Sequence, residues 1–334
     1  MILRAFTFDF CAYGQKNSAI DSLENMLSTA KADTAKVDCL NALSRQYMKI
    51  SDYKMSLQYA ESALELAAKL DYKKGIAISY ANIGDDHSYQ GNYPEALENY
   101  FTSLKIKEEI GDKIGIANTY NNIGIIYQKQ GNWADALEKY FASLKIKEEI
   151  GIKKGIAGSY NNIANIYRLQ LNYQEALEYY FASVKINEEI GDKRGVAGTY
   201  INIGYMYQIQ DKYGEALEYY LSSVKIFEEI GNKKYLAMAY NNIGTLYNKM
   251  GNYPEALENY SASLKIKEEI GNKSGVAHSY LNIGNVYYSQ GNYPEALKKY
   301  FASLKIFEEI EYHVGIAVVK NNIATIYLEQ GNYS

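Results

Sequence analysis

The stretch "YNNIGIIYQKQGNWADALEKYFASL", residues 120–144, contains two helical periods separated by a short break. In its first half, apolar or small residues recur at i, i+3, i+4 and i+7, namely Tyr120, Ile123, Gly124 and Tyr127. The second half repeats this spacing and adds one more step, with Ala136, Leu137, Tyr140 and Leu144. Each set forms one apolar stripe on an α-helix, and the Gly-Asn pair between them marks a turn. We therefore predict a helix A from about Lys113 to Gln130 and a helix B from about Ala134 to Ile150.

This pattern recurs every 40 residues, and each unit is numbered here from a grid position that a small residue occupies. The grid residues are Ser44, Gly84, Gly124, Ala164, Gly204, Gly244, Gly284 and Ala324. Twelve residues after the first seven of them, the residue is again small: Ser56, Ala96, Ala136, Ala176, Ala216, Ala256 and Ala296. Small residues at both positions let helices A and B approach closely, and a large side chain there would overpack the contact. Tyrosines also recur at fixed distances from the grid residue, three positions after it and four positions before it. These helical positions predict that the tyrosines belong to the core.

The spacing Tyr120, Ile123, Gly124, Tyr127, Ala136, Tyr140 resembles the tetratricopeptide repeat, whose pattern is W-x2-L-G-x2-Y followed by Ala and an aromatic residue. The units here are 40 residues long rather than 34, Tyr mostly replaces Trp, and no Pro closes helix B. Such lengthened repeats are similar to those of kinesin light chains, spindle-orientation adaptors and the repeat blocks of bacterial sensor proteins. The resemblance implies an all-α, right-handed superhelix of about seven and a half helical hairpins, with helix A inside and helix B outside.

We predict four regions along the chain. Residues 1–15 look like a leader or a disordered N-terminus, and residues 16–35 like a capping helix in which Ile20, Leu23, Met26 and Leu27 cover the first repeat. Residues 36–315 hold seven 40-residue repeats, and residues 316–334 hold an eighth that contains helix A only. We expect that last helix to leave Ile323, Ile326 and Tyr327 partly uncovered.

The composition disfavours several functions. The formal charge of −4 and the pI of about 5.6 argue against nucleic acid and against an anionic membrane surface. No apolar run is long enough for membrane insertion, and the motifs of nucleotide-binding, metalloprotease and hydrolase sites are absent. We therefore expect no enzyme activity, no cofactor and no metal.

Asp85, Asp86 and His87 form the one cluster with metal-ligating chemistry, which we interpret as drift because neighbouring helix residues point in different directions. The "LKIKEEI" segments at 104–110, 144–150 and 264–270 predict a solvated outer face.

One polar column resists a purely structural explanation. Two residues before the grid, Asn recurs in what we name the first asparagine column: Asn82, Asn122, Asn162, Asn202, Asn242, Asn282 and Asn322. One residue earlier lies a second asparagine column, formed by Asn41, Asn121, Asn161, Asn241 and Asn321. In the family that this chain resembles, the first column faces the concave groove, where Asn can bond to a peptide main chain. Alternatively, duplication copied the residue, or each Asn bonds to a neighbouring repeat. Positions one and four residues after the grid vary, and Gln128 and Arg168 among them are further candidate groove residues.

Three functional hypotheses follow from these observations. The first is a non-enzymatic scaffold that binds an extended peptide or partner segment in the groove. The second is a sensory or regulatory module of a larger bacterial signalling protein with a cyclase or histidine-kinase output. The third is a structural array that self-associates through its C-terminal helix. For location, we expect the cytoplasm, or the periplasm or an exported state if the N-terminus derives from a leader.

Overall fold

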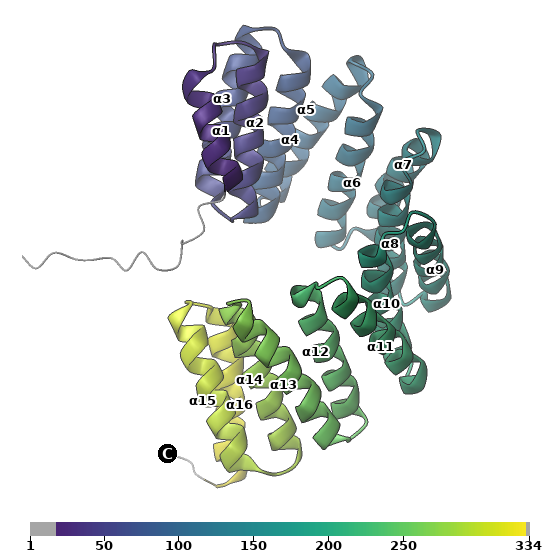
Figure 1. The fold of residues 1–334 in the computed structure, drawn as a ribbon, viewed down its shortest axis with the longest axis vertical. Coiled ribbons are helices and arrows are strands. Elements are labelled where there is room, and N and C mark those ends of the chain that lie inside the picture. Colours follow the sequence, from purple (N-terminus) through teal and green to yellow (C-terminus); the bar gives the residue numbers. More distant parts are fainter. Residues whose placement is uncertain (1–17, 332–334) are drawn as a thin grey trace, which may run out of the picture. The chain divides into compact units, whose positions relative to one another are not determined.

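The computed structural model describes residues 18–331, and within this range the chain forms sixteen α-helices and no strand (Figure 1). The first helix is followed by alternating A and B helices, as predicted. Their bounds are α1 Ser18–Thr29, α2 Thr34–Lys49, α3 Tyr53–Lys69, α4 Lys73–Gln90, α5 Tyr93–Glu109, α6 Lys113–Lys129, α7 Trp133–Glu149, α8 Lys153–Leu169, α9 Tyr173–Glu189, α10 Lys193–Gln208, α11 Tyr213–Glu229, α12 Lys233–Lys249, α13 Tyr253–Glu269, α14 Lys273–Ser289, α15 Tyr293–Glu309 and α16 His313–Glu329.

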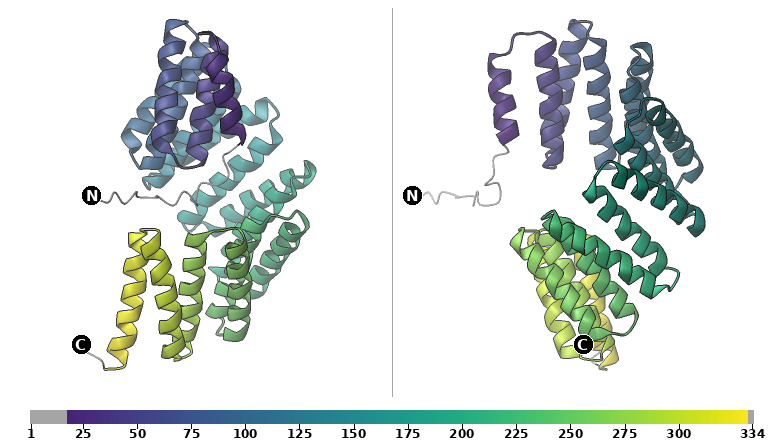
Figure 2. Two further views of the ribbon diagram at one scale, coloured as in Figure 1. Left: turned by 60° about the vertical axis from the view of Figure 1, so that its left-hand side comes forward. Right: turned by 45° about the vertical axis from the view of Figure 1, so that its right-hand side comes forward.

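The helices divide between two compact units, one ending at Gly155 and the other beginning at Ile156. In each unit a helix A packs against the helix B that follows it, and that helix B packs against the next helix A (Figure 2). The even-numbered helices from α2 to α16 are the A helices, and the odd-numbered helices from α3 to α15 are the B helices. The predictions for helix A and helix B of one unit are confirmed by α6 and α7 to within one residue at each end.

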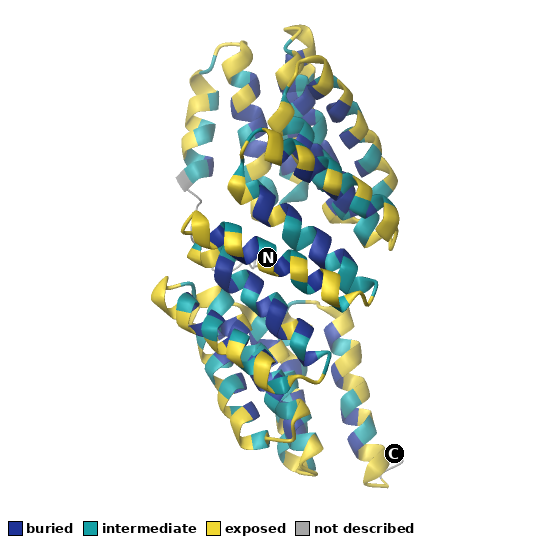
Figure 3. Cartoon of the chain, turned by 90° about the vertical axis from the view of Figure 1, so that its right-hand side faces the viewer, coloured by how far each residue is buried: buried dark blue, intermediate teal, exposed yellow. Residues whose placement is uncertain are grey.

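The contact between helices A and B forms around a buried tyrosine. A Cβ atom on Gly124 would lie 2.7 Å from Cε1 of Tyr140, which is fully buried. Gly84, Gly204, Gly244 and Gly284 face the equivalent tyrosine in the same way. The grid residue is therefore small because a tyrosine ring packs directly against it, and not only because of the alanine twelve residues later. Buried residues repeat along the helices from α2 to α16, as Figure 3 shows.

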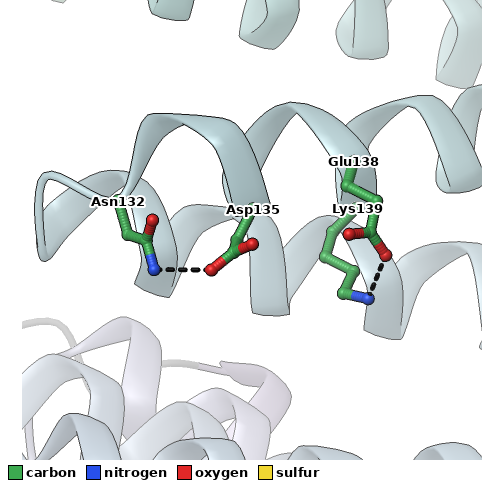
Figure 4. Close-up of polar contacts among 4 residues, drawn as sticks. All are labelled: Asn132, Asp135, Glu138 and Lys139. Carbon is green, nitrogen blue, oxygen red and sulfur yellow. Dashed lines mark hydrogen bonds and ion pairs between the residues drawn. The ribbon is translucent and has the colours of Figure 1, made fainter.

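Tight turns join the helices through a single residue with left-handed backbone geometry. Glycine holds this position in most units, as at Gly131 with φ 76°. Leu171, with φ 64°, and Asp211, with φ 57°, take the same conformation without the freedom of glycine. Polar contacts then mark the start of helix B: in Figure 4 the Asn132 amide donates to Asp135 at 2.6 Å. One turn further along, Lys139 pairs with Glu138 at 2.6 Å.

The ends of the described range differ from the sequence prediction in two respects. The lead-in helix α1 is shorter than residues 16–35, and it buries Ile20 against the first repeat while Met26 is 59% exposed. In α16, Ile323 and Ile326 are buried, so the expectation that they are uncovered was wrong, whereas Tyr327 is 38% exposed. Residues 1–15, for which a leader-like or disordered N-terminus was predicted, lie outside the described range.

Candidate functional site

Each buried tyrosine of helix B directs its hydroxyl to a polar side chain on the preceding helix A. Four of them use the residue one position after the grid: Tyr100 bonds to Asp85, Tyr180 to Asn165, Tyr260 to Thr245 and Tyr300 to Asn285. The other two use the residue four positions after the grid: Tyr140 donates to Gln128 and Tyr220 to Gln208. In those two units the nearer position holds Ile125 or Tyr205, and a glutamine supplies the acceptor instead.

The positions one and four residues after the grid therefore have a structural role, because one of them supplies the partner of the buried tyrosine hydroxyl. This role is separate from any role in recognition. A buried hydroxyl without a partner is costly, so each unit supplies an acceptor at one position or the other. Gln128 is therefore engaged, because its Oε1 accepts from Tyr140 at 2.8 Å. Arg168, at the farther position of its unit, is not needed for this purpose, since Tyr180 donates to Asn165 at 2.7 Å.

Three members of the first asparagine column donate to the second asparagine column of the preceding repeat. The distances from Nδ2 to Oδ1 are 3.0 Å for Asn82 to Asn41, 3.5 Å for Asn202 to Asn161 and 3.0 Å for Asn282 to Asn241. Asn82 and Asn41 are only 3% and 1% exposed. That pair lies inside the contact between repeats, and we assign it a structural role.

Two other members use a different acceptor, because the second column of the preceding repeat is apolar there. Ala81 and Leu281 stand in that column. Asn122 donates instead to Oδ1 of Asp85 at 3.1 Å, and Asn322 donates to Oδ1 of Asn285 at 3.3 Å. Asn121 and Asn162 also have partners.

Asn242 is the member of the first asparagine column that forms no hydrogen bond within residues 18–331. The preceding repeat places Ile201 in the second column and Tyr205 one position after the grid, so both usual acceptors are missing. The Asn242 side chain is half-buried and lines a hollow of about 330 Å³. The hollow is lined by Asn165, Arg168, Tyr180, Ile201, Asn202, Tyr205 and Asn242.

The charge of this hollow comes from Arg168. Its guanidinium lies 5.6 Å from the centroid of the Tyr205 ring, and among residues 18–331 no carboxylate pairs with it within 4 Å. Burial raises the pKa of Tyr180 to about 12, and the positive charge of Arg168 opposes that rise. A guanidinium and a free amide at one hollow can together bind carbonyl or carboxylate oxygens.

The remaining candidate residues lie at other hollows of the second unit. Asn241 and Asn282 line one of about 360 Å³ that also contains Lys267, and Asn322 lines one of about 290 Å³. Asn165 and Tyr205 hold the variable position one residue after the grid, which was predicted to line the groove, whereas Lys267 was missed because its segment was predicted to be solvated. The signal for Asn242 was present in the sequence, because Ile201 interrupts the second column one repeat earlier.

In the Asp85–Asp86–His87 cluster, the two carboxylates accept hydrogen bonds from neighbouring helices, whereas Nδ1 of His87 is buried without a partner. Asp86 is fully buried, and its Oδ2 accepts from the Ser56 hydroxyl at 2.9 Å. Asp85 accepts from Tyr100 and Asn122, as described above. In the described part of the chain, no three His, Cys, Asp or Glu side chains are grouped so that they could hold a metal ion. The same residues contain no helix that is both long and apolar enough to cross a bilayer.

Paired helices, a small grid residue and a tyrosine-centred contact define a helical-repeat array. The tetratricopeptide repeat family model matches residues 36–109, 77–149, 115–189, 155–229, 195–269, 235–307 and 275–334, and the chain belongs to this family. Such arrays are typically protein–protein interaction modules. No curated protein matches the chain.

Several solved structures share the fold at low sequence identity. Aspartyl phosphate phosphatase F from Bacillus subtilis has a TM-score of 0.61 and 14% identity, over 92% of this chain and 87% of that one. A Rap protein complexed with Competence and Sporulation Factor has a TM-score of 0.57 and 15% identity, over 93% and 97%. A signal transduction ATPase with numerous domains from Pyrococcus horikoshii, which has a tetratricopeptide repeat sensor, has a TM-score of 0.63 and 17% identity, over 92% and 50%.

Proposed function

We propose that this chain is a non-enzymatic scaffold whose A helices hold an extended segment of a partner protein. The observation that carries this proposal is the unpaired amide of Asn242 beside Arg168. Every other described Asn of its column has a partner, so Asn242 differs from the rest of the array in being available to a ligand. An amide can both donate to and accept from a peptide bond, which makes it suited to a main chain of any sequence.

The environment of Asn242 supports the same role. The Tyr205 ring is 41% exposed and lies beside Arg168, so the hollow offers an apolar face next to two polar groups. Peptide sites commonly combine such a surface with a few placed hydrogen-bonding groups. A Rap protein of similar fold is described as complexed with Competence and Sporulation Factor, and by analogy we propose a partner segment for this chain.

The test uses peptides selected from a displayed random library against the intact chain. We expect Asn242→Ala to weaken the binding of selected peptides by about tenfold, because one hydrogen bond in a partly dry site contributes about 1.4 kcal/mol. Asn122→Ala is the matched control, since its amide is already engaged by Asp85. Titration calorimetry measures both variants. Equal affinities for Asn242→Ala and wild type, with unchanged circular dichroism, would refute the proposal.

A second variant tests the same idea without removing the amide. Ile201→Asn restores the acceptor that other repeats present to the following asparagine. We expect Asn242 to bond to it, as Asn282 bonds to Asn241, and peptide affinity to fall. Unchanged affinity in this variant would show that the availability of Asn242 has no part in binding.

The sensor hypothesis remains a proposal of the same kind. A tetratricopeptide sensor occurs in the signal transduction ATPase of similar fold, and a partner segment held by the A helices is compatible with a sensory role. The scaffold proposal is preferred because a particular group, Asn242, supports it in this chain.

A further inference from the structure

The "LKIKEEI" segments are not wholly solvated, contrary to the sequence prediction. The second lysine of each segment is buried: Lys107 is 6% exposed, Lys147 is 7% and Lys267 is 9%. Each lies in the last turn of a helix B and extends beneath the helix A that follows. A glycine lies eight residues later, where a Cβ on Gly275 would meet both Nδ2 of Asn272 at 2.5 Å and Cδ of Lys267 at 3.0 Å. Elsewhere the same slot holds Asn187, Phe227 or Phe307.

Lys107 and Lys267 form a matched pair within one chain. Each ammonium donates to a hydroxyl twelve residues later, Lys107 to Thr119 and Lys267 to Ser279, both at 2.8 Å. The surrounding charge differs. The carboxylates of Asp112 and Asp85 oppose the lowering of the Lys107 pKa that burial causes.

The position that Asp112 holds beside Lys107 is Asn272 beside Lys267. Burial lowers the pKa of Lys267 to about 8, and no carboxylate counteracts this effect. Within residues 18–331, no carboxylate lies within 4 Å of its ammonium. An uncompensated buried ammonium is costly, and a nearby anion would relieve that cost.

Lys267 borders a hollow of about 360 Å³ that carries no negative charge. Its lining is Lys234, Tyr235, Met238, Asn241, Lys267, Ile270, Asn272, Gly275, His278 and Asn282. Lys234 adds a second, exposed cation. Asn241 accepts from Asn282 through its oxygen, and its Nδ2 donates to no group in the described residues, so this amide can donate to a ligand.

We propose that this hollow binds a carboxylate, supplied by an Asp or Glu side chain of the partner segment. That source rests on the proposed function, whereas the preference for a carboxylate rests on Lys267, Lys234 and Asn241 alone. The ligand carboxylate supplies from the hollow the negative charge that Asp112 supplies near Lys107, since Asn272 fills the position of Asp112 itself. The site is thus a repeat in which the internal counter-charge has been replaced by an external one.

The first arm of the test uses sodium acetate as the probe and the whole chain with 13C-labelled lysine. NMR follows the titration of Lys267, with acetate replacing chloride at constant ionic strength. We expect acetate to raise the pKa of Lys267 from about 8 toward 10.5, because a bound carboxylate favours the charged amine. The titration of Lys107 serves as the internal control and should not move. A Lys267 pKa that is the same in acetate and chloride would overturn the proposal.

Two variants make this arm specific. Asn272→Asp supplies an internal carboxylate, so it should raise the Lys267 pKa without acetate and remove the response to acetate. Lys267→Phe identifies the Lys267 signal, and it should fold because Phe307 occupies the same slot beside Gly315. If Asn272→Asp leaves the acetate response intact, acetate acts elsewhere and the proposal fails.

The second arm uses the peptides selected above, each prepared with Glu and with Gln at every acidic position. We expect wild type to prefer the Glu form by about tenfold, and Lys267→Phe to lose that preference. If acetate acts but Glu and Gln peptides bind equally, an acidic side chain is excluded as the ligand. If no peptide binds at all, the proposed function fails, and the acetate arm still decides whether the hollow takes a carboxylate.

Discussion

Asp86 is a carboxyl group at a position that the later repeats fill with apolar side chains. Its counterparts, all fully buried, are Ile126, Ile166, Met206, Leu246, Val286 and Ile326. Oδ2 of Asp86 accepts from Ser56, but Oδ1 is buried without a partner. Burial raises the pKa of this carboxyl from 3.8 to about 6, and the adjacent Asp85 carboxylate adds to that rise. We therefore predict that Asp86→Asn stabilises the first unit at neutral pH.

The magnitude and the pH window follow from the same two pKa values. Because the folded-state pKa exceeds the unfolded one, the charged form disfavours folding, and the full penalty applies above pH 6. Below pH 3.8 both states are protonated and the penalty vanishes. The difference corresponds to about 2–3 kcal/mol. Wild type should thus lose stability relative to Asp86→Asn as the pH rises between these values.

Hydrogen exchange measured by mass spectrometry is the suitable assay, because a repeat array need not unfold in one step. We expect amides of α3 and α4 to exchange about 30- to 150-fold more slowly in Asp86→Asn than in wild type at pH 7.5, with little difference at pH 4. Comparing the two proteins at each pH removes the intrinsic pH dependence of exchange. Asp135→Asn, at the accessible start of α7 (Figure 4), is the control and should show no such trend. A stabilisation by Asp86→Asn that is equal at both pH values would refute the assignment of the penalty to a buried charge.

Three further predictions follow from the packing. Gly124→Ala should destabilise the first unit by about 1–3 kcal/mol in urea unfolding, because its Cβ would lie 2.7 Å from the Tyr140 ring, and an unchanged midpoint would contradict this contact. Leu171→Gly should stabilise the second unit by about 1 kcal/mol, since Leu171 has a φ of 64° and a 69% exposed side chain, and calorimetry should show a higher Tm. Tyr220→Phe should cost about 1–3 kcal/mol and Tyr140→Phe less, because Tyr220 leaves the buried Gln208 without its donor; equal losses would argue against this difference.

The fold could be predicted from the sequence because its signals are local and repeated many times. Helical periods of apolar residues gave the bounds of α6 and α7, and the Gly-Asn breaks gave the turns. The repeat length then placed the same hairpin along most of the chain. Less predictable were the ends of the array, where α1 is shorter than expected and Ile323 is buried, and the residue closest to the grid glycine, because periodicity does not tell whether Tyr140 or Ala136 makes that contact.

The candidate sites were harder to predict because they depend on pairs of residues in different repeats. The partner of an asparagine in the first column lies 41 or 37 residues earlier, and it changes with the residue found there. The buried lysines were missed for a related reason. Lys267 belongs to a charged segment, and only Gly275 and Ser279 in the following helix A indicate that it is covered.

In an array this regular, each repeat serves as a control for the others. In some repeats a residue differs from its column and a second residue compensates for it. Tyr205 replaces the usual hydrogen-bond partner of the buried tyrosine, and Gln208 accepts from Tyr220 instead. Where the partner does not change, a polar group is left without its usual contact. Asn242 is of this second kind. Lys267 keeps a hydroxyl partner but lacks the carboxylate that Asp112 places near Lys107, and both residues border hollows of the second unit. Stability explains neither feature, because Asn242 forms no hydrogen bond among the described residues and the buried charge of Lys267 has no carboxylate near it, and we propose that a ligand completes both contacts.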